Sequence, residues 1–141
     1  MPLKLSLKPG ERFVVNGAVL QNGDRRAVLL LQNKASILRE KDIIQPEDVT
    51  TPGRHIYFPI MMMYLDPPEA NRYYDEFVLR LNEFMGAIRS TEILKECVSL
   101  SREVMAADYY KALTRCRKLL TYEQGLLGNV HPGLPDSSSE D

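Results

Sequence analysis

The chain has 141 residues, of which 44% are hydrophobic and 26% charged, and its formal net charge is −1. This length allows one ordinary domain, or two small modules that share a core, and excludes a large multidomain enzyme. No apolar run approaches the roughly 20 residues of a membrane-spanning helix, and Pro9, Gly10 and Glu11 interrupt the start before a secretory signal could form. We therefore expect a soluble, cytoplasmic protein.

Residue types that carry chemistry are sparse in this chain. Cys97 and Cys116 fall in helical patterns, so we expect them to be buried, reduced side chains. His55 and His131 are far apart, and neither has a partner at metal-ligand spacing. The chain has no Ser-His-Asp candidates, zinc-protease motif, Walker loop or dinucleotide fingerprint. We expect no enzyme activity, no metal and no cofactor.

Short apolar runs alternate with turn dipeptides over the first 43 residues. Residues 3–7 alternate with period two and end at Pro9-Gly10, which indicates a strand and a turn. Two Asn-Gly pairs, at 16–17 and 22–23, tolerate the positive φ of hairpin turns and predict an antiparallel meander. Residues 26–32 are apolar on both faces, which is typical of a central strand or of a strand in a subunit interface.

The same segment holds most of the excess positive charge. Over residues 1–41, eight basic residues stand against three acidic ones, and 8 − 3 gives +5, so the rest of the chain is negative. The basic residues are Lys4, Lys8, Arg12, Arg25, Arg26, Lys34, Arg39 and Lys41. Clustered Lys and Arg release counterions when they neutralise phosphates, which favours a polyanion as partner. Lysines that protect sheet edges are the alternative, and with Phe13 as its single aromatic residue the segment shows no stacking platform.

Residues 43–65 are very apolar and contain three prolines, Pro46, Pro52 and Pro59. Because proline breaks regular helices, we expect extended, interrupted structure there. Residues 61–63 are three consecutive methionines, which we interpret as packing against the sheet rather than as a partner-binding surface.

The second half predicts three amphipathic helices. Residues 66–69 have the composition of a helix start, and an apolar stripe with Phe77 and Leu81 at its middle follows. The pattern restarts after residues 86–90, and Asp108 is the expected cap of a third helix that ends near Gly125 or Gly128.

These patterns divide the chain into three parts. Residues 1–65 are the expected β module and residues 66–128 the helical module, a bundle or lid over the sheet. Residues 129–141 are rich in serine, proline and acids, and are expected to be a disordered tail.

The running sequence of residues 2–43, followed by IYFPIMMMYLD and a helical second half, resembles the FlbT family of flagellar regulators. The resemblance covers the whole chain and carries no catalytic signature. It implies a post-transcriptional regulator that binds the 5′ untranslated region of flagellin mRNA, restrains translation and promotes decay of the message. It also implies a link to a second small flagellar regulator, FlaF.

The first third also resembles the CsrA-type RNA-binding translational regulators. Those proteins have a basic residue just before an x-Gly-Glu turn, and a strand ending in an Arg-Glu-Glu-Ile-like sequence whose arginine contacts RNA. The resemblance matches Arg39 to that arginine, Lys8 to a basic residue of the first strand and Leu5 to an apolar neighbour. Leu7 stands where that family has a second arginine important for RNA. Since these regulators form intertwined dimers, the resemblance implies a possible homodimer through the β module.

We therefore expect an α+β regulator, with a small antiparallel, barrel-like β module that touches mRNA and a bundle of about three helices. The expected RNA-binding residues are Lys4, Leu5, Lys8, Arg39 and Lys41, with Lys8 and Arg39 as solvated charges at strand ends. The alternative is a helical adaptor or chaperone that does not bind RNA and acts through FlaF or flagellin.

Overall fold

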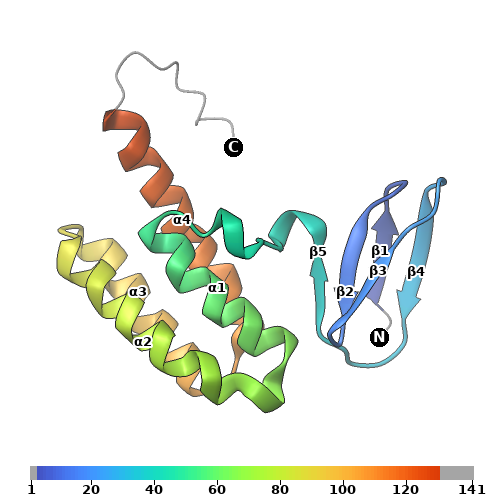
Figure 1. Ribbon diagram of the computed structural model, residues 1–141, viewed down its shortest axis with the longest axis horizontal. Helices are drawn as coiled ribbons and strands as arrows, with labels where there is room; N and C mark the ends of the chain where they lie inside the picture. The colour runs from blue at the N-terminus through green and yellow to red at the C-terminus, as the bar shows by residue number, and fades with distance from the viewer. Residues whose placement is uncertain (1–2, 131–141) are drawn as a thin grey trace.

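The computed structural model of the protein describes residues 3–130, and side-chain burial as far as residue 127. Within these residues five strands come first and four α-helices follow, which confirms the expected α+β class (Figure 1). The strands are β1 (Leu3–Leu7), β2 (Arg12–Val15), β3 (Ala18–Gln21), β4 (Ala27–Leu31) and β5 (Ile37–Arg39). The helices are α1 (Pro52–Leu65), α2 (Ala70–Ala87), α3 (Thr91–Met105) and α4 (Tyr109–Val130). Single 3₁₀ turns occur at Glu40–Asp42, Pro46–Asp48 and Pro67–Glu69.

The strands form two small antiparallel sheets, with orders β1-β4 and β3-β2-β5, rather than one continuous meander. Only β2 and β3 form the expected tight hairpin, in which Asn16 and Gly17 have φ of +50° and +85°. Asn22 does not close a second hairpin. Its side-chain amide donates to the carbonyl oxygens of Lys8 and Arg25, both at 2.8 Å, which joins two loops and directs the chain towards β1.

Strand β4 lies at the edge of a two-stranded sheet, so the expectation of a central strand was wrong. Its residues Val28, Leu29 and Leu30 remain exposed, because among the described residues β4 makes extensive contact only with β1. The inner side chains of the other strands form a small core of the β module: Leu5, Leu7, Phe13 and Ile37.

Residues 52–65 are helical, so the expected extended structure was also wrong. The Thr51 side chain accepts a hydrogen bond from the backbone N–H of Arg54 at 3.2 Å, and Pro52 occupies the first turn, where no N–H is needed. Pro59 lies inside the helix and removes one backbone hydrogen bond. Packing outweighs this loss, because side chains at helical spacing are fully enclosed: Ile56, Ile60 and Met63.

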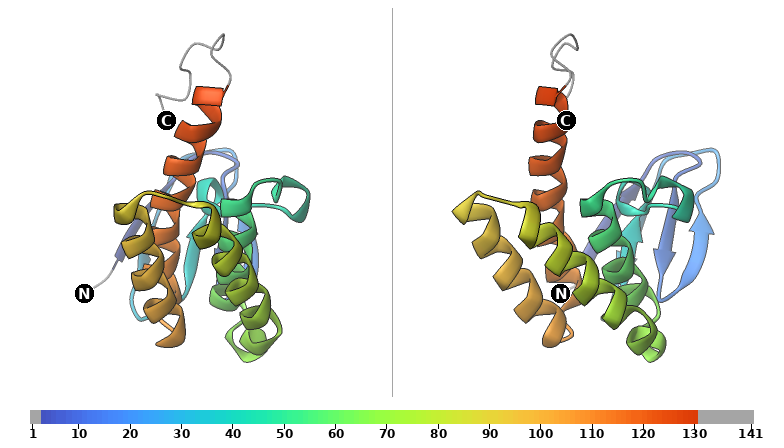
Figure 2. Two further views of the ribbon diagram at one scale, coloured as in Figure 1. Left: turned by 90° about the vertical axis from the view of Figure 1, so that its left-hand side faces the viewer. Right: turned by 60° about the vertical axis from the view of Figure 1, so that its left-hand side comes forward.

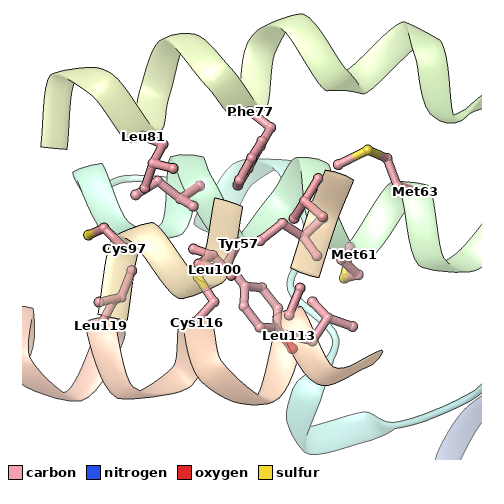
Figure 3. Close-up of a cluster of buried hydrophobic side chains, with 14 of the residues drawn as sticks. Tyr57, Met61, Met63, Phe77, Leu81, Cys97, Leu100, Leu113, Cys116 and Leu119 are labelled. Carbon is pink, nitrogen blue, oxygen red and sulfur yellow. The ribbon is translucent and has the colours of Figure 1, made fainter. Parts of the chain in front are cut away.

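Four helices make up the helical part, one more than expected. α1 packs against α2 and α4, and α3 packs against α4. Figure 3 shows the shared core, in which side chains of all four helices converge. Phe77 and Leu81 are 1% and 4% exposed, as their place in the apolar stripe predicts. Cys97 and Cys116 are buried free thiols, which confirms that expectation as well.

The helix ends differ in detail from the expected ones. The Asp66 side chain makes no capping hydrogen bond, and its backbone N–H ends α1 by donating to Met62 O at 2.9 Å. α4 continues to Val130, past the expected end, and its last turns extend beyond the other helices (Figure 2). Residues 131–141 of the expected tail lie outside the described residues. None of the described helices has the length and apolarity needed to cross a membrane.

Strand β5 and the segment after it join the β module to the helices (Figure 1). Leu38 and Val14 point into the helical core. The Tyr64 hydroxyl accepts from the backbone N–H of Ile37 at 2.7 Å and donates to its carbonyl oxygen at 2.9 Å. The modules are therefore fixed to each other by both apolar and polar contacts.

Candidate nucleic-acid interface

The turn between β1 and β2 places Lys8 at the surface. Pro9 and Gly10 occupy its centre, Gly10 has φ of +72°, and the N–H of Glu11 donates to Lys8 O at 3.1 Å. This is the arrangement of a type II turn, in which only glycine readily takes the left-handed position. The Lys8 backbone N–H also donates to Glu11 Oε1 at 2.9 Å, so the turn is closed from both sides.

Arg39, at the end of β5, is bound within the protein. Its Nη2 and Nε lie 2.9 Å and 3.1 Å from Glu11 Oε2, and Nη2 also donates to the carbonyl oxygen of Ser6. The expectation of a solvated charge was wrong for this residue. Because Arg39 ends its strand beside the Pro-Gly-Glu turn, its guanidinium lies against the Glu11 carboxylate. The planar group can donate to this carboxylate and to the Ser6 carbonyl at the same time.

The Glu11 carboxylate is held in its charged form. The hydrogen bond from the Lys8 N–H, and then the contact with Arg39, lower its pKa below the ordinary value of 4.5. Glu11 thus remains an acceptor that keeps Arg39 in place at neutral pH.

A cavity of about 610 Å³ opens beside this turn and brings together three of the five expected site residues: Lys8, Arg39 and Lys41. Glu11 and Glu40 line it as well, so three basic residues stand against two acidic ones, a balance of +1. Lys8 and Lys41 are exposed and form no ion pair within residues 3–130.

The other two expected residues lie elsewhere. Leu5 is buried between the sheets and lines a second cleft, between the β module and the helices. Lys4 precedes Leu5 in β1, so its side chain points to the opposite, exposed face of the strand, beside Leu30 of β4. The structure therefore does not bring Lys4 and Leu5 to the cavity at Lys8.

The loop between β3 and β4 adds basic residues near Lys8. The Gly10 N–H donates to Gly23 O at 2.8 Å, so this loop lies against the β1-β2 turn. Arg25 and Arg26 are exposed in it. The end of the β module thus presents basic residues from two loops that are separate in the sequence.

The second cleft contains residues that the sequence interpretation missed. Tyr64, Tyr110, Lys34 and Arg117 line it, and they come from α1, α4 and the segment before β5. Sequence patterns gave no signal for this grouping, because Tyr64 fell in a segment expected to be extended and Tyr110 in a helix expected to pack a core.

These features define a small α+β protein with a basic β-module end and a mixed aromatic and basic cleft at the junction with its helices. The family model described as "Flagellar protein FlbT" matches residues 3–127. The chain therefore belongs to the FlbT family of flagellar proteins.

Curated relatives agree with this assignment. The chain is 65% identical over 134 residues to "Flagellum biosynthesis repressor protein FlbT" of Caulobacter vibrioides (strain ATCC 19089 / CIP 103742 / CB 15), with 95% of each chain covered. It is 33% identical over 141 residues to "Probable flagellum biosynthesis repressor protein FlbT 1" of Bradyrhizobium diazoefficiens, with 99% of this chain and 94% of the relative covered. No solved structure gives a significant match.

Proposed function

We propose that this protein represses flagellum biosynthesis by binding the 5′ untranslated region of flagellin mRNA, which blocks translation and leads to decay of the message. Family membership and the printed names of the relatives, which describe repressors, support the regulatory part. The observation that favours RNA is the grouping of exposed basic residues at one end of the β module.

Two kinds of basic residue act differently in this proposal. Lys8 and Lys41 are exposed and belong to no ion pair within residues 3–130, so they offer mobile charges to phosphates. Arg39 is engaged by Glu11 and Ser6, and it positions the turn that presents Lys8. Sequence-independent attraction to the RNA backbone therefore comes from the lysines, and the arginine fixes their geometry.

The test is the binding of purified protein to flagellin leader RNA, by fluorescence anisotropy, over a series of salt concentrations. Each phosphate contact contributes a slope of about 0.7 in log Kd against log salt for a single strand, so Lys8→Ala with Lys41→Ala should lower the slope by roughly 1 to 1.5. Lys95→Ala, an exposed change on α3, is the matched control and should leave the slope unchanged. Absence of binding by the wild-type protein at near-physiological salt would contradict the proposed function.

The alternative, an adaptor that acts through FlaF or flagellin, is favoured by one feature of the helical part. An apolar cavity of about 510 Å³ lies between the start of α1 and the ends of α2 and α4, with Phe84, Ile88, Leu126 and Leu127 in its wall. Leu127 is 45% exposed there. If the protein is such an adaptor, Leu127→Asp should abolish its co-purification with FlaF or flagellin. The wild-type protein should then not bind leader RNA.

A further inference from the structure

The cleft at the junction of the two modules has a volume of about 790 Å³. Its walls come from β1, from Asn16 in the turn between β2 and β3, from residues 34–42, from the end of α1 and from the first half of α4. These segments are far apart in the sequence, and β5 lies between the β module and the helices at the junction (Figure 1). The cleft is distinct from the cavity at Lys8, although Arg39 and Lys41 line both.

Two tyrosines form an aromatic wall of this cleft. The ring centroids of Tyr64 and Tyr110 are 5.7 Å apart, with a tilt of 45° between the planes. Both hydrogen bonds of the Tyr64 hydroxyl go to Ile37, so its ring is fixed and supports its neighbour. Tyr110 is 53% exposed, so about half of its surface is open to solvent beside the fixed ring of Tyr64.

The charge of the cleft is positive. Four basic residues line it against one acidic residue, Asp42. Arg39 is paired with Glu11 and Arg117 with Asp42, so the charge that no ion pair among residues 3–130 matches comes from Lys34 and Lys41. Arg117 Nε lies 3.2 Å from Asp42 Oδ1, so this pair neutralises itself, and Arg117 Nη2 has no hydrogen-bond acceptor in the described part of the chain. Lys34 and Lys41 are exposed at the rim and belong to no ion pair there.

We propose that this cleft binds single-stranded RNA, with one base stacked on Tyr110 and the adjoining phosphates held by Lys34 and Lys41. An aromatic face flanked by unpaired cations is the combination that single-stranded nucleic acids occupy, because every base has a π-face and every linkage a negative charge. This inference rests on the proposed RNA-binding function and deepens it. It supplies the stacking platform that the β module lacks, from helices at the other end of the chain.

Stacking and charge are tested separately with flagellin leader RNA. Tyr110→Ala should weaken binding about 5- to 150-fold, the range for loss of one base-aromatic stack, while Tyr110→Phe keeps the ring and should bind like wild type. Leu79→Ala, on an α2 residue with nearly the same exposure, 51%, is the matched control and should change nothing. A leader RNA carrying 2-aminopurine should lose fluorescence on binding to wild type and Tyr110→Phe, and keep it with Tyr110→Ala.

Salt dependence completes the test. Tyr110→Ala should leave the slope of log Kd against log salt unchanged, because stacking releases no counterions, whereas Lys34→Ala should lower it by about 0.7. If wild type binds and Lys8→Ala weakens binding, but Tyr110→Ala and Lys34→Ala bind normally, the cleft assignment is overturned and the proposed function stands. If wild type does not bind leader RNA, both are overturned. Circular dichroism on each variant confirms that the fold is retained.

Discussion

Arg39 connects three parts of the β module: its own strand β5, the turn through Glu11, and β1 through the Ser6 carbonyl. It is only half-buried, but its removal takes a donor from the Ser6 carbonyl and leaves the Glu11 carboxylate with the Lys8 N–H as its remaining partner among residues 3–130. Lys8, in contrast, contributes only its backbone to the turn. The Arg39 side chain is therefore expected to contribute more to stability than the Lys8 side chain, although the resemblance to CsrA-type regulators pointed to both.

We predict that Arg39→Ala lowers the urea midpoint of unfolding clearly, whereas Lys8→Ala leaves it almost unchanged. Arg39→Lys should restore the midpoint only in part, because an ammonium cannot bond the carboxylate in two places and reach the Ser6 carbonyl as well. Equal midpoints for wild type and Arg39→Ala would show that the cross-link adds nothing to stability. Any RNA-binding defect of Arg39→Ala must be judged against its folded fraction.

Glu11 makes stability depend on pH. Its pKa in the folded protein is lowered below the ordinary 4.5, first by the Lys8 N–H and then by Arg39. The unfolded chain thus takes up this proton at a higher pH than the folded protein, so the contribution of Glu11 is present above about pH 4.5 and is lost as the pH falls further.

We predict that Glu11→Gln flattens the dependence of unfolding free energy on pH between about pH 5 and pH 3, because the variant has no carboxylate to protonate. Chemical unfolding at several pH values measures this. Asp75→Asn, an exposed change on α2, should keep the wild-type dependence. The idea fails if the Glu11→Gln curve runs parallel to that of wild type down to pH 3.

At the scale of elements, α1 shows how tertiary contacts place a helix start. The Gly53 N–H donates to Glu123 Oε2 at 2.7 Å, so a carboxylate of α4 satisfies a free donor in the first turn of α1. Glu123 is the one buried charged side chain among the described residues, 8% exposed. A Cβ on Gly53 would lie 2.7 Å from Glu123 Oε1 and 3.0 Å from Leu120 Cδ2. Glycine is therefore needed for close approach of the two helices.

We predict that Gly53→Ala destabilises the protein by about 1–3 kcal/mol, through overpacking against α4. Gly86→Ala is the matched control, since a Cβ there meets nothing within 4 Å and the residue lies in α2. That change should stabilise by about 0.5–1 kcal/mol, the difference in helix propensity. Thermal and urea unfolding of both variants measure the effects, and a Gly53→Ala protein as stable as wild type would mean that α4 moves away without cost.

At the scale of the whole molecule, the β module is incomplete by itself. The sheet of β1 and β4 has only two strands, and an isolated pair of strands is marginally stable. β4 has an open edge and exposes Val28 and Leu30, at 55% and 58%, on the face that also carries Lys4. An exposed apolar edge of this kind invites pairing with another chain.

The homodimer through the β module stays a prediction, and the structure points to β4 as the strand through which two copies would pair. Pairing of β4 with β4 of a second copy would give a four-stranded sheet and cover the open edge. Sedimentation equilibrium should then give twice the chain mass of 16.1 kDa for wild type and a monomer for Leu30→Lys. A wild-type mass of one chain at micromolar concentration would contradict it, and Val98→Lys, an exposed change on α3, controls for added charge.

The sequence by itself determined the features that depend on local pattern. Period-two and period-3.6 spacing placed the first strand and the stripe around Phe77 and Leu81, and Asn16-Gly17 specified its hairpin through positive φ. The charge balance and the running resemblance indicated a basic β module of an FlbT-type protein. Lys8, Arg39 and Lys41, three of the five expected site residues, line one cavity, because they flank neighbouring strand ends.

Only the tertiary structure decided what depends on contacts between distant segments. α1 is a helix despite Pro59 because burial of its apolar side chains outweighs one missing hydrogen bond. The strands form two sheets rather than one meander, and the Asn22 amide ties together the loops before and after β2 and β3. Tyr110 lies beside Tyr64 and in the same cleft as Lys34 because α4 packs against α1 near the segment before β5. Each of these outcomes depends on contacts between segments that are distant in the sequence. The free energy of such contacts cannot be judged from a short stretch of residues.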